Sequence, residues 1–388
     1  MNTKQTDKIN ILKAVTEFKT LFNNSEHLNL EAGGTIFPVN VAYQTYGSLN
    51  NEGTNAILIC HALTGNAHAA GELSNAESDA NAADDCLKKY SEMNIGKPGW
   101  WDNMIGPGKT FDTGKYFVIC SNILGSCYGT TGPVSLNPGT SKAYQKDFPI
   151  VTVRDIVKVQ YKLIRELGVN RLKTVTGGSL GGMQALEWAV MYPEIVESII
   201  PIACPAKHSD WAIGFNETGR RAIINDPEYN GGYYSKQPSN GFELARMIAM
   251  ITYRSDVSFN DKFRHEHINN KGSYYDKANL FQVQNYLNYQ GKKLVKRFDA
   301  NAYITLSDVM DLHDITYGRA PLKDVLGAVK AKTLTIGIST DILYYPHEQK
   351  EIASLIPAGR YAEIDSPYGH DAFLIEFEQM NRIIREFL

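Results

Sequence analysis

The sequence predicts an α/β fold in which a mostly parallel sheet is flanked by helices and interrupted by an inserted helical domain. Helical patterns alternate with short, almost purely apolar runs, as expected for strands that are buried on both faces of a sheet. The insertion is indicated by residues 205–325, where strand-like runs cease and aromatic and polar residues at helical spacing increase. The apolar runs that we interpret as buried strands are residues 56–60, 116–120, 172–176, 198–204 and 333–339.

The composition is that of an ordinary globular protein, with 43% hydrophobic and 21% charged residues and a formal net charge of −3. This charge gives no reason to expect nucleic acid or an anionic membrane as a partner. No apolar run is long enough for a membrane span, and the N-terminus lacks the apolar stretch of a signal peptide. The five cysteines form no C-x-x-C pair, so we expect reduced thiols and a cytoplasmic location. The histidines show no metal-binding spacing, and no metal site is predicted.

The first part of the chain contains two strands between less regular segments. Residues 1–33 are polar and weakly patterned, and we expect a short leader there. Residues 35–46 alternate as in a strand, and a turn at 51–55 precedes the buried strand 56–60. Residues 66–98 are rich in Ala, Asn, Asp, Ser and Gly, which favours a long surface loop.

Two Gly-rich segments follow. Residues 99–108 contain two adjacent tryptophans, whose large rings need to be buried by other parts of the chain. Residues 121–138 follow the strand 116–120 at its carboxyl end, where α/β folds place ligands. Residues 152–155 (TVRD) resemble a capping box and therefore predict the start of a helix that ends at Gly168.

The chain length permits one large domain with an insertion, and we expect a core at 1–204, a helical lid at 205–325 and further core at 326–388. The alternative is that the middle segment belongs to one continuous core. Within the lid, helical patterns cover residues 241–253, 280–289 and 301–313. After it we expect a strand at 333–339, a helix at 347–355, a strand at 361–364 and a closing helix at 371–388.

The most informative stretch is residues 177–182 (GGSLGG), which matches the G-x-S-x-G pattern around Ser179. An apolar strand at 172–176 leads into it and a helical pattern at 183–192 leads out, as in a nucleophile elbow. Such a turn exposes the serine hydroxyl at a helix N-terminus, where negative charge is favoured. The alternative is a Gly-rich strand-to-helix turn whose serine has no chemical role.

A nucleophilic serine needs a base within hydrogen-bonding reach and an acid that orients the base. In the α/β-hydrolase fold these residues follow in the order serine, acid, histidine. Asp341 comes directly after the strand 333–339, and His370 follows the strand 361–364. Because the carboxyl ends of parallel strands meet at one edge of the sheet, we predict the catalytic triad Ser179, Asp341 and His370.

Other residues compete for these roles. His313 lies between two aspartates but inside the insertion, His347 is expected to cap a helix, and Asp365 is too close in sequence to His370 to orient it. For the oxyanion hole we expect the backbone N–H groups of Leu180 and Leu63. His61, two residues before Leu63, is interpreted as a structural residue of that turn.

Several long motifs then identify a family. They are CHALTG at 60–65, GWWDNMIGPGKTFDT at 99–113, CSNILGSCYGTTGP at 120–133, GGSLGGMQALEWA at 177–189 and DSPYGHDAFL at 365–374. With these motifs in this order, the chain resembles the homoserine O-acyltransferases of methionine synthesis from Leu28 to the C-terminus.

The resemblance implies a ping-pong transfer in which Ser179 takes an acyl group from acyl-CoA, expected to be acetyl-CoA, and passes it to L-homoserine. It implies no tightly bound cofactor, a helical lid and a homodimer built through the lids. Asp371 and an arginine of the insertion are expected to hold the amino acid. The arginine corresponds best to Arg246, with Arg254 as the second choice; alternatively, Asp371 caps a helix at 372–387.

Related functions remain open at this point. They are a homoserine O-succinyltransferase or a serine O-acyltransferase of the same family, an ester hydrolase, and a binding protein of the same fold without catalytic activity. The resemblance to the family also implies that Thr64, within HALTG, favours the acetyl donor.

Overall fold

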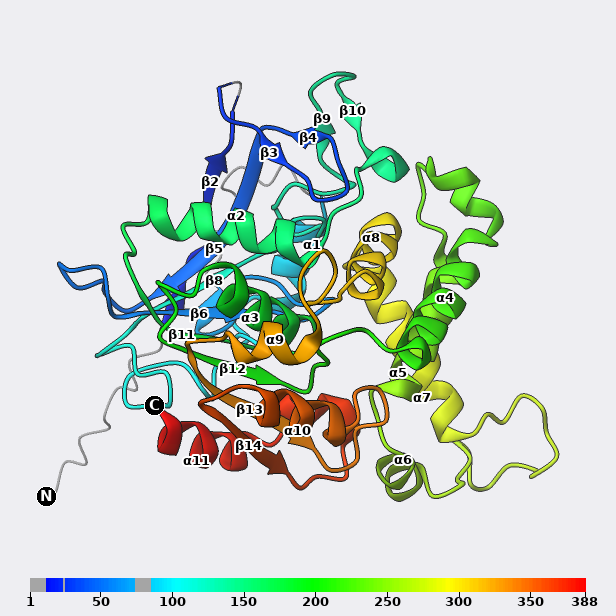
Figure 1. Ribbon diagram of the computed structural model, residues 1–388. Helices are drawn as coiled ribbons and strands as arrows, with labels where there is room; N and C mark the ends of the chain where they lie inside the picture. The colour runs from blue at the N-terminus through cyan, green and yellow to red at the C-terminus, as the bar shows by residue number, and fades with distance from the viewer. Residues whose placement is uncertain (1–11, 24, 74–84) are drawn as a thin grey trace, which may run out of the picture.

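The computed structural model describes residues 12–23, 25–73 and 85–388 and contains an eight-stranded sheet (Figure 1). Its six neighbouring strands from β14 to β8 run parallel, while β5 is antiparallel to β8 and β2 is antiparallel to β5. The predicted fold class is thereby confirmed. In spatial order the strands are β14 (Gly359–Ile364), β13 (Lys332–Ile338), β12 (Ser198–Ile202), β11 (Leu172–Gly178), β6 (Ala56–Cys60), β8 (Phe117–Ser121), β5 (Val39–Tyr46) and β2 (Glu17–Leu21).

Both faces of the sheet are covered, because successive residues of the parallel strands point into two different apolar cores. In β6, for example, Leu58 belongs to the core beneath α2 and α3, whereas Ile57 and Ile59 belong to the core that contains residues of α11. The helices of the core are α2 (Val153–Glu166), α3 (Leu180–Met191), α9 (Leu322–Gly327), α10 (Pro346–Leu355) and α11 (Phe377–Phe387). Helix α2 starts with the predicted capping box, in which Thr152 accepts a hydrogen bond from the N–H of Asp155.

Short strand pairs and 3-10 turns complete the connections. The pairs are β1 (Lys13–Ala14) with β7 (Glu72–Leu73), β3 (Leu28–Asn29) with β4 (Thr35–Ile36), and β9 (Leu136–Asn137) with β10 (Lys142–Ala143). The turns are η2 (Gln145–Asp147), η3 (Pro227–Gly232) and η4 (Gly369–Leu374).

The polar N-terminal stretch is not simply a leader. Its described part includes β2, which pairs with β5 over five residues and forms the edge of the sheet. The strand was missed because most of its side chains are exposed, as for Phe18, so the apolar alternation of a half-buried strand is absent.

The prediction of a surface loop at 66–98 is also wrong in part. Ala69 and Ala70 are completely buried, and their N–H groups donate to the hydroxyl of Tyr46 at 3.1 and 3.0 Å. Small side chains permit this close packing against the core, although the same composition is typical of loops. Helix α1 (Asp85–Asn94) follows, and residues 74–84 of the expected loop lie outside the described residues.

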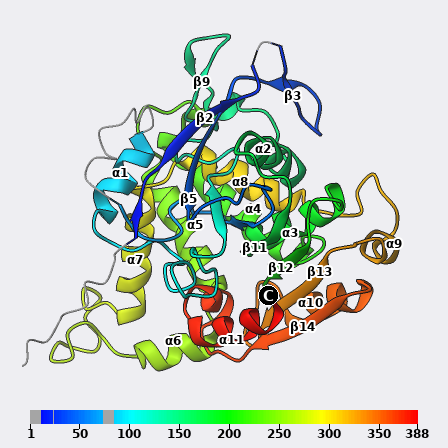
Figure 2. The same cartoon turned by 90° about the vertical axis from the view of Figure 1, so that its left-hand side faces the viewer.

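Between β12 and β13 the chain forms a helical layer that lies to one side of the sheet (Figures 1 and 2). Several of its helices begin with side-chain caps, from Ser209, Ser255 and Asp299. This layer spans most of the predicted lid and consists of α4 (Asp210–Ile224), α5 (Ser239–Thr252), α6 (Asp256–Phe263), α7 (Gln282–Val295) and α8 (Ala300–Asp311).

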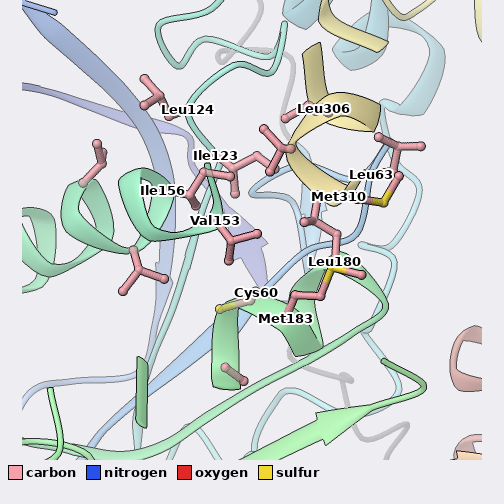
Figure 3. Close-up of a cluster of buried hydrophobic side chains, with 14 of the residues drawn as sticks. Cys60, Leu63, Ile123, Leu124, Val153, Ile156, Leu180, Met183, Leu306 and Met310 are labelled. Carbon is pink, nitrogen blue, oxygen red and sulfur yellow. The ribbon is translucent and has the colours of Figure 1, made fainter. Parts of the chain in front are cut away.

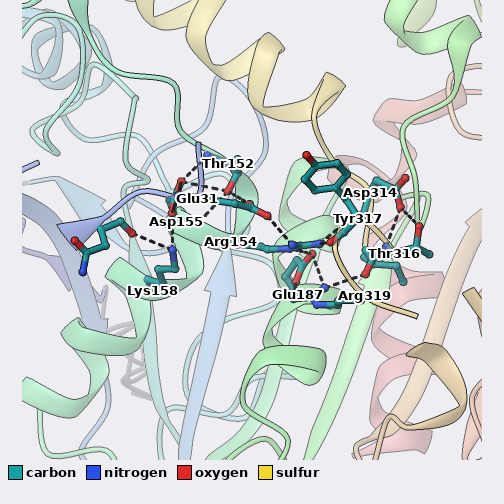
Figure 4. A network of polar contacts seen from close by, with 12 residues as sticks. Glu31, Thr152, Arg154, Asp155, Lys158, Glu187, Asp314, Thr316, Tyr317 and Arg319 are labelled. Atoms are coloured by element: carbon teal, nitrogen blue, oxygen red, sulfur yellow. Dashed lines mark hydrogen bonds and ion pairs between the residues drawn. The ribbon is translucent and has the colours of Figure 1, made fainter. Parts of the chain in front are cut away.

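A partly buried ion network joins the returning end of this layer to the core (Figure 4). Arg154 of α2 contacts Glu31 at 2.5 Å and Glu187 at 3.1 Å, and it donates to the carbonyls of Asp314 and Tyr317. Arg319 reaches the other oxygen of Glu187 at 2.8 Å, so this almost fully buried carboxylate is paired twice. Such pairing offsets the cost of burying the charge and fixes where the chain re-enters the core.

No helix in the described part of the chain combines the length and apolar character that a bilayer span requires. Within that same part, no group of three His, Cys, Asp or Glu residues is placed to hold a metal ion.

Candidate active site

Ser179 sits in a strained turn between β11 and α3. Its φ of 58° and ψ of −125° lie outside the regions that L-residues ordinarily occupy. The glycines beside it are sterically required, because a Cβ on Gly177 or Gly181 would lie 2.2 Å from the carbonyl oxygen of Cys60. The end of β6 therefore packs directly on the turn, and this contact holds the serine at the N-terminus of α3 as the G-x-S-x-G pattern predicts.

We expect Gly177→Ala to destabilise the fold by at least about 2 kcal/mol and to abolish acylation, because the new methyl group has to displace β6. Thermal unfolding and the rate of serine acylation would measure the two effects. Gly214→Ala is the control: a Cβ there meets open space within α4, and alanine is expected to stabilise the helix by about 0.5–1 kcal/mol. A Gly177→Ala protein with parental stability and activity would contradict this account of the turn.

His370 and Asp341 form a buried pair. The Nδ1 of His370 lies 2.6 Å from Oδ2 of Asp341, and the other carboxylate oxygen accepts from the N–H groups of Leu343 and Tyr344 at 2.8 and 3.0 Å. Burial by itself lowers the pKa of His370, but the negative charge and hydrogen bond of Asp341, aided by Asp371, raise it above its ordinary value. The carboxylate thus holds the proton on Nδ1 and leaves Nε2 to accept one.

His370 and Ser179 line the same cavity, which has a volume of about 260 Å³. Nε2 is buried and has no hydrogen-bond partner among the described residues. The imidazole is wedged between Tyr344 and Phe373, whose ring centroids lie 5.1 and 5.6 Å away in edge-on arrangements. This packing restricts rotation of the ring and keeps Nε2 available to the cavity.

The predicted oxyanion residues, Leu63 and Leu180, come from two segments: Leu63 lines the cavity, and Leu180 directly follows Ser179 in the chain. Leu180 is the first residue of α3 and Leu63 belongs to the turn after β6; in the described part of the chain, neither N–H donates a hydrogen bond. Both side chains are buried with Met183 and Met310 in one apolar cluster (Figure 3). The cluster therefore anchors the two backbone segments that carry these N–H groups.

His61 holds the turn that carries Leu63. Its Nε2 accepts from the N–H of Ile123 at 3.2 Å, its Nδ1 lies 2.8 Å from the carbonyl of Ala62, and burial lowers its pKa to about 4. Arg297, which follows α7, supports the same turn by donating to the carbonyl of Thr64 at 3.1 Å. The structure therefore places His61 in a supporting position.

Asp371 lines the cavity next to His370, and the two candidate arginines stand in different relations to it. Arg246, on α5, lines the same cavity, with its guanidinium carbon 5.5 Å from the ring centroid of Tyr253. Arg254 lies outside this lining and contacts Asp371, its Nε being 3.2 Å from Oδ2. Burial raises the pKa of Asp371 even though Arg254, Arg246 and His370 each act to lower it.

The predicted closing helix at 371–388 is wrong in its first part. Residues 369–374 form the 3-10 turn η4, and α11 begins at Phe377 with Glu376 at its N-cap position. Asp371 consequently does not cap that helix, which removes the alternative explanation for this residue. A single 3-10 turn and a helix share similar apolar spacing over so few residues, so the sequence pattern could not separate them.

The competing residues lie elsewhere. His313 is buried with its Nε2 3.3 Å from the carbonyl of Pro205, and burial lowers its pKa to about 3. His347 lies in the first turn of α10 and stacks on Tyr345, so it does not occupy the N-cap position. Asp365 accepts a hydrogen bond from Ser339. None of these three residues lines the cavity that contains Ser179.

Sequence reasoning overlooked other residues of the cavity wall. Tyr90, Trp100 and Arg297 line it together with the predicted residues. The adjacent tryptophans at 100 and 101 indicated aromatic rings that need to be buried. Tyr90, in α1, and Arg297, just after α7, had no distinguishing pattern because neither belongs to one of the motifs.

Comparisons with known proteins identify the fold and the family. A family model for the alpha/beta hydrolase fold matches residues 55–377. A homoserine O-acetyltransferase from Carboxydothermus hydrogenoformans is 50% identical over 368 residues, which is 93% of this chain and 92% of that protein.

Solved structures give the same result. The crystal structure of homoserine O-acetyltransferase from Bacillus anthracis is 30% identical with a TM-score of 0.84, covering 97% of this chain and 98% of that one. The crystal structure of esterase E22 is also 30% identical, with a TM-score of 0.83 and coverage of 96% and 99%. On its similarity to curated relatives along nearly its whole length, this chain belongs to the homoserine O-acetyltransferase family of α/β-hydrolase-fold enzymes.

Proposed function

We propose that this enzyme transfers an acetyl group from acetyl-CoA to the hydroxyl of L-homoserine through an acetyl-Ser179 intermediate. The observation that carries the proposal is the buried 2.6 Å contact between His370 and Asp341 beside a strained serine in one cavity, in a chain 50% identical to a homoserine O-acetyltransferase. Acyltransfer through a serine requires this combination of nucleophile, base and orienting acid.

In the first half-reaction His370 Nε2 takes the proton of Ser179 as its oxygen attacks the thioester carbonyl. The N–H groups of Leu63 and Leu180 stabilise the oxyanion, and the collapse of the intermediate breaks the C–S bond, with the proton passing to the thiolate of CoA. In the second half-reaction His370 takes the proton of the homoserine hydroxyl. That oxygen attacks the acetyl-serine, and the proton returns to Ser179 as O-acetylhomoserine leaves.

For the acceptor we propose a clamp of opposite charges. Homoserine carries an ammonium group, which suits Asp371, and a carboxylate, which suits the guanidinium of Arg246 on the facing lid helix. Among the described residues Arg246 has no ion-pair partner, whereas Arg254 is already paired with Asp371. We therefore assign carboxylate binding to Arg246 and the positioning of Asp371 to Arg254.

We expect Asp371→Asn and Arg246→Lys each to weaken the use of homoserine by about 1–3 kcal/mol of transition-state stabilisation, because a charged or bidentate contact is lost. Acetylation of Ser179 by acetyl-CoA should proceed at nearly the parental rate. The two half-reactions are measured separately, as CoA release without acceptor and as O-acetylhomoserine formation.

The matched control is Arg360→Lys, which alters an exposed arginine on β14 and should leave both half-reactions unchanged. If Asp371→Asn and Arg246→Lys use homoserine as well as the parent does, the amino acid is held by other residues and the clamp is wrong.

The donor and acceptor are tested by offering acetyl-CoA and succinyl-CoA, each with homoserine or serine, and identifying the ester by mass spectrometry. O-acetylhomoserine as the dominant product would support the proposal. The structural neighbour esterase E22 makes hydrolysis the second candidate, since water could replace homoserine in the second half-reaction. Free acetate forming at the same rate with and without homoserine would favour that candidate and count against the transferase.

We further propose a cytoplasmic homodimer that works without a tightly bound cofactor. The lid supports the dimer, because it presents apolar side chains to solvent: Leu244 and Ile251 of α5 are about half exposed, as is Tyr289 of α7. Such side chains gain from burial against a second copy. Sedimentation at micromolar concentration should give twice the chain mass, and a monomer there would contradict this proposal.

A further inference from the structure

A second cavity, of about 360 Å³, lies beside the one that contains Ser179. It is lined by residues of α6 and α7 and by Pro367 and Tyr368, the residues that precede η4. Arg254 belongs to its wall and also contacts Asp371, which lines the first cavity. The backbone of Arg254 packs so tightly on Gly369 that a Cβ there would lie 2.7 Å from it. The second cavity is therefore separated from His370 by one layer of chain.

The wall of this cavity carries two cations. Lys262 of α6 lines it together with Arg254, and the positive charge of Arg254, after the effect of burial, contributes to lowering the pKa of Lys262. In the described part of the chain Lys262 has no carboxylate partner, whereas Arg254 is paired with Asp371. Asp261 supplies the one carboxylate on the wall itself. Asp371 and Asp261 balance these two cations overall, but among the described residues the ammonium of Lys262 forms no ion pair, so it is available to an anionic ligand.

The rest of the wall is aromatic. Phe259 and Phe263 of α6, Tyr286 of α7 and Tyr368 all line the cavity, and the ammonium of Lys262 lies 4.2 Å from the centre of the Tyr286 ring. Aromatic faces next to phosphate-binding cations are the combination that holds a nucleotide, since the base stacks on the rings while the cations bind the phosphates.

We propose that this second cavity binds the phosphorylated adenosine end of the acyl-CoA donor. The inference rests on the proposed function, which requires a substrate whose thioester reacts at Ser179 and whose phosphates lie at the far end of a flexible pantetheine arm. A cationic, aromatic cavity that is next to the cavity of Ser179 but separate from it suits a donor whose phosphates lie far from its thioester. Lys262 binds phosphate as a compact charge, and Arg254 serves both sites by also holding Asp371.

The test compares two acetyl donors in the full-length enzyme: acetyl-CoA, and S-acetylpantetheine, which lacks the nucleotide. We expect Lys262→Gln to raise KM for acetyl-CoA by about tenfold, and Lys262→Glu to raise it further, because a phosphate contact is lost and then replaced by repulsion. With S-acetylpantetheine both variants should match the parent. Lys262 is exposed on its helix, so the substitutions should leave thermal stability unchanged.

The control is Lys332→Gln, which alters an exposed lysine at the end of β13 opposite to Asp341 and should change neither donor. Calorimetric titration with CoA measures binding in the absence of turnover, and Lys262→Gln should weaken the affinity for CoA by a similar factor. The inference is overturned if the Lys262 variants treat the two donors alike or if CoA binding is unchanged. A parent enzyme that makes no O-acetylhomoserine from either donor would instead refute the proposed function.

Discussion

Ser179→Ala is expected to abolish the acetyl-enzyme and to lower the overall rate by about 10⁴-fold or more. The variant retains the cavity, the oxyanion N–H groups and the His370–Asp341 pair, but it has no oxygen to attack the thioester. Because alanine is smaller than serine, the strained turn should still form, and the thermal stability should remain near that of the parent. Mass spectrometry after mixing with acetyl-CoA measures the outcome directly.

The matched control is Ser354→Ala on α10. The hydroxyl of Ser354 is exposed and donates only to the carbonyl of Glu351 in its own helix, so its removal should not affect acetylation. Parent and control should gain one acetyl group, and peptide mapping should place it on Ser179. An acetyl group found on another residue, or acetylation of Ser179→Ala at the parental rate, would refute the proposed nucleophile.

The positions of Ser179, Asp341 and His370 could be anticipated from the sequence because the relevant signals are local and the topology is restrictive. A glycine on each side of Ser179 is demanded by the carbonyl of Cys60, which approaches to 2.2 Å from where a Cβ would stand. Asp341 and His370 each follow a parallel strand closely. Parallel neighbours β11, β12, β13 and β14 end on one edge of the sheet, so residues far apart in sequence become neighbours in space.

The parts that sequence reasoning missed depend on tertiary packing. The edge strand β2 has exposed side chains and is defined by its pairing with β5, which no local pattern reveals. The sequence around Ala69 and Ala70 is typical of a loop, and only the contacts of their N–H groups with the hydroxyl of Tyr46 reveal their packing in the core. In these segments the tertiary environment overrides the local propensity.

The choice between Arg246 and Arg254 also depends on tertiary packing. Arg246 and Arg254 are separated by about two helical turns, and their sequence surroundings gave only a preference. The structure separates them, since one lines the cavity of Ser179 and the other pairs with Asp371 and faces the second cavity. The two side chains enter different surroundings because α5 ends at Thr252, between Arg246 and Arg254.

Asp341→Asn is expected to slow acetylation of Ser179 by about 10³–10⁴-fold, through the wrong tautomer of His370. One oxygen of Asp341 accepts from two backbone N–H groups, so the amide oxygen of asparagine must take that place. Its NH₂ group then faces Nδ1 of His370 and donates to it. The proton is thereby shifted to Nε2, which can no longer accept one from Ser179.

The pH dependence gives an independent measurement of the same interaction. In the parent His370 must be neutral to act, and because its pKa is raised, the rate of CoA release should climb with pH through a midpoint above the ordinary histidine value of about 6.5. In Asp341→Asn the negative charge is lost while burial remains, so the midpoint should move to lower pH. Asp365→Asn, at an exposed aspartate, is the control and should leave rate and midpoint unchanged. A midpoint that stays in place in Asp341→Asn would show that Asp341 does not set the protonation of His370.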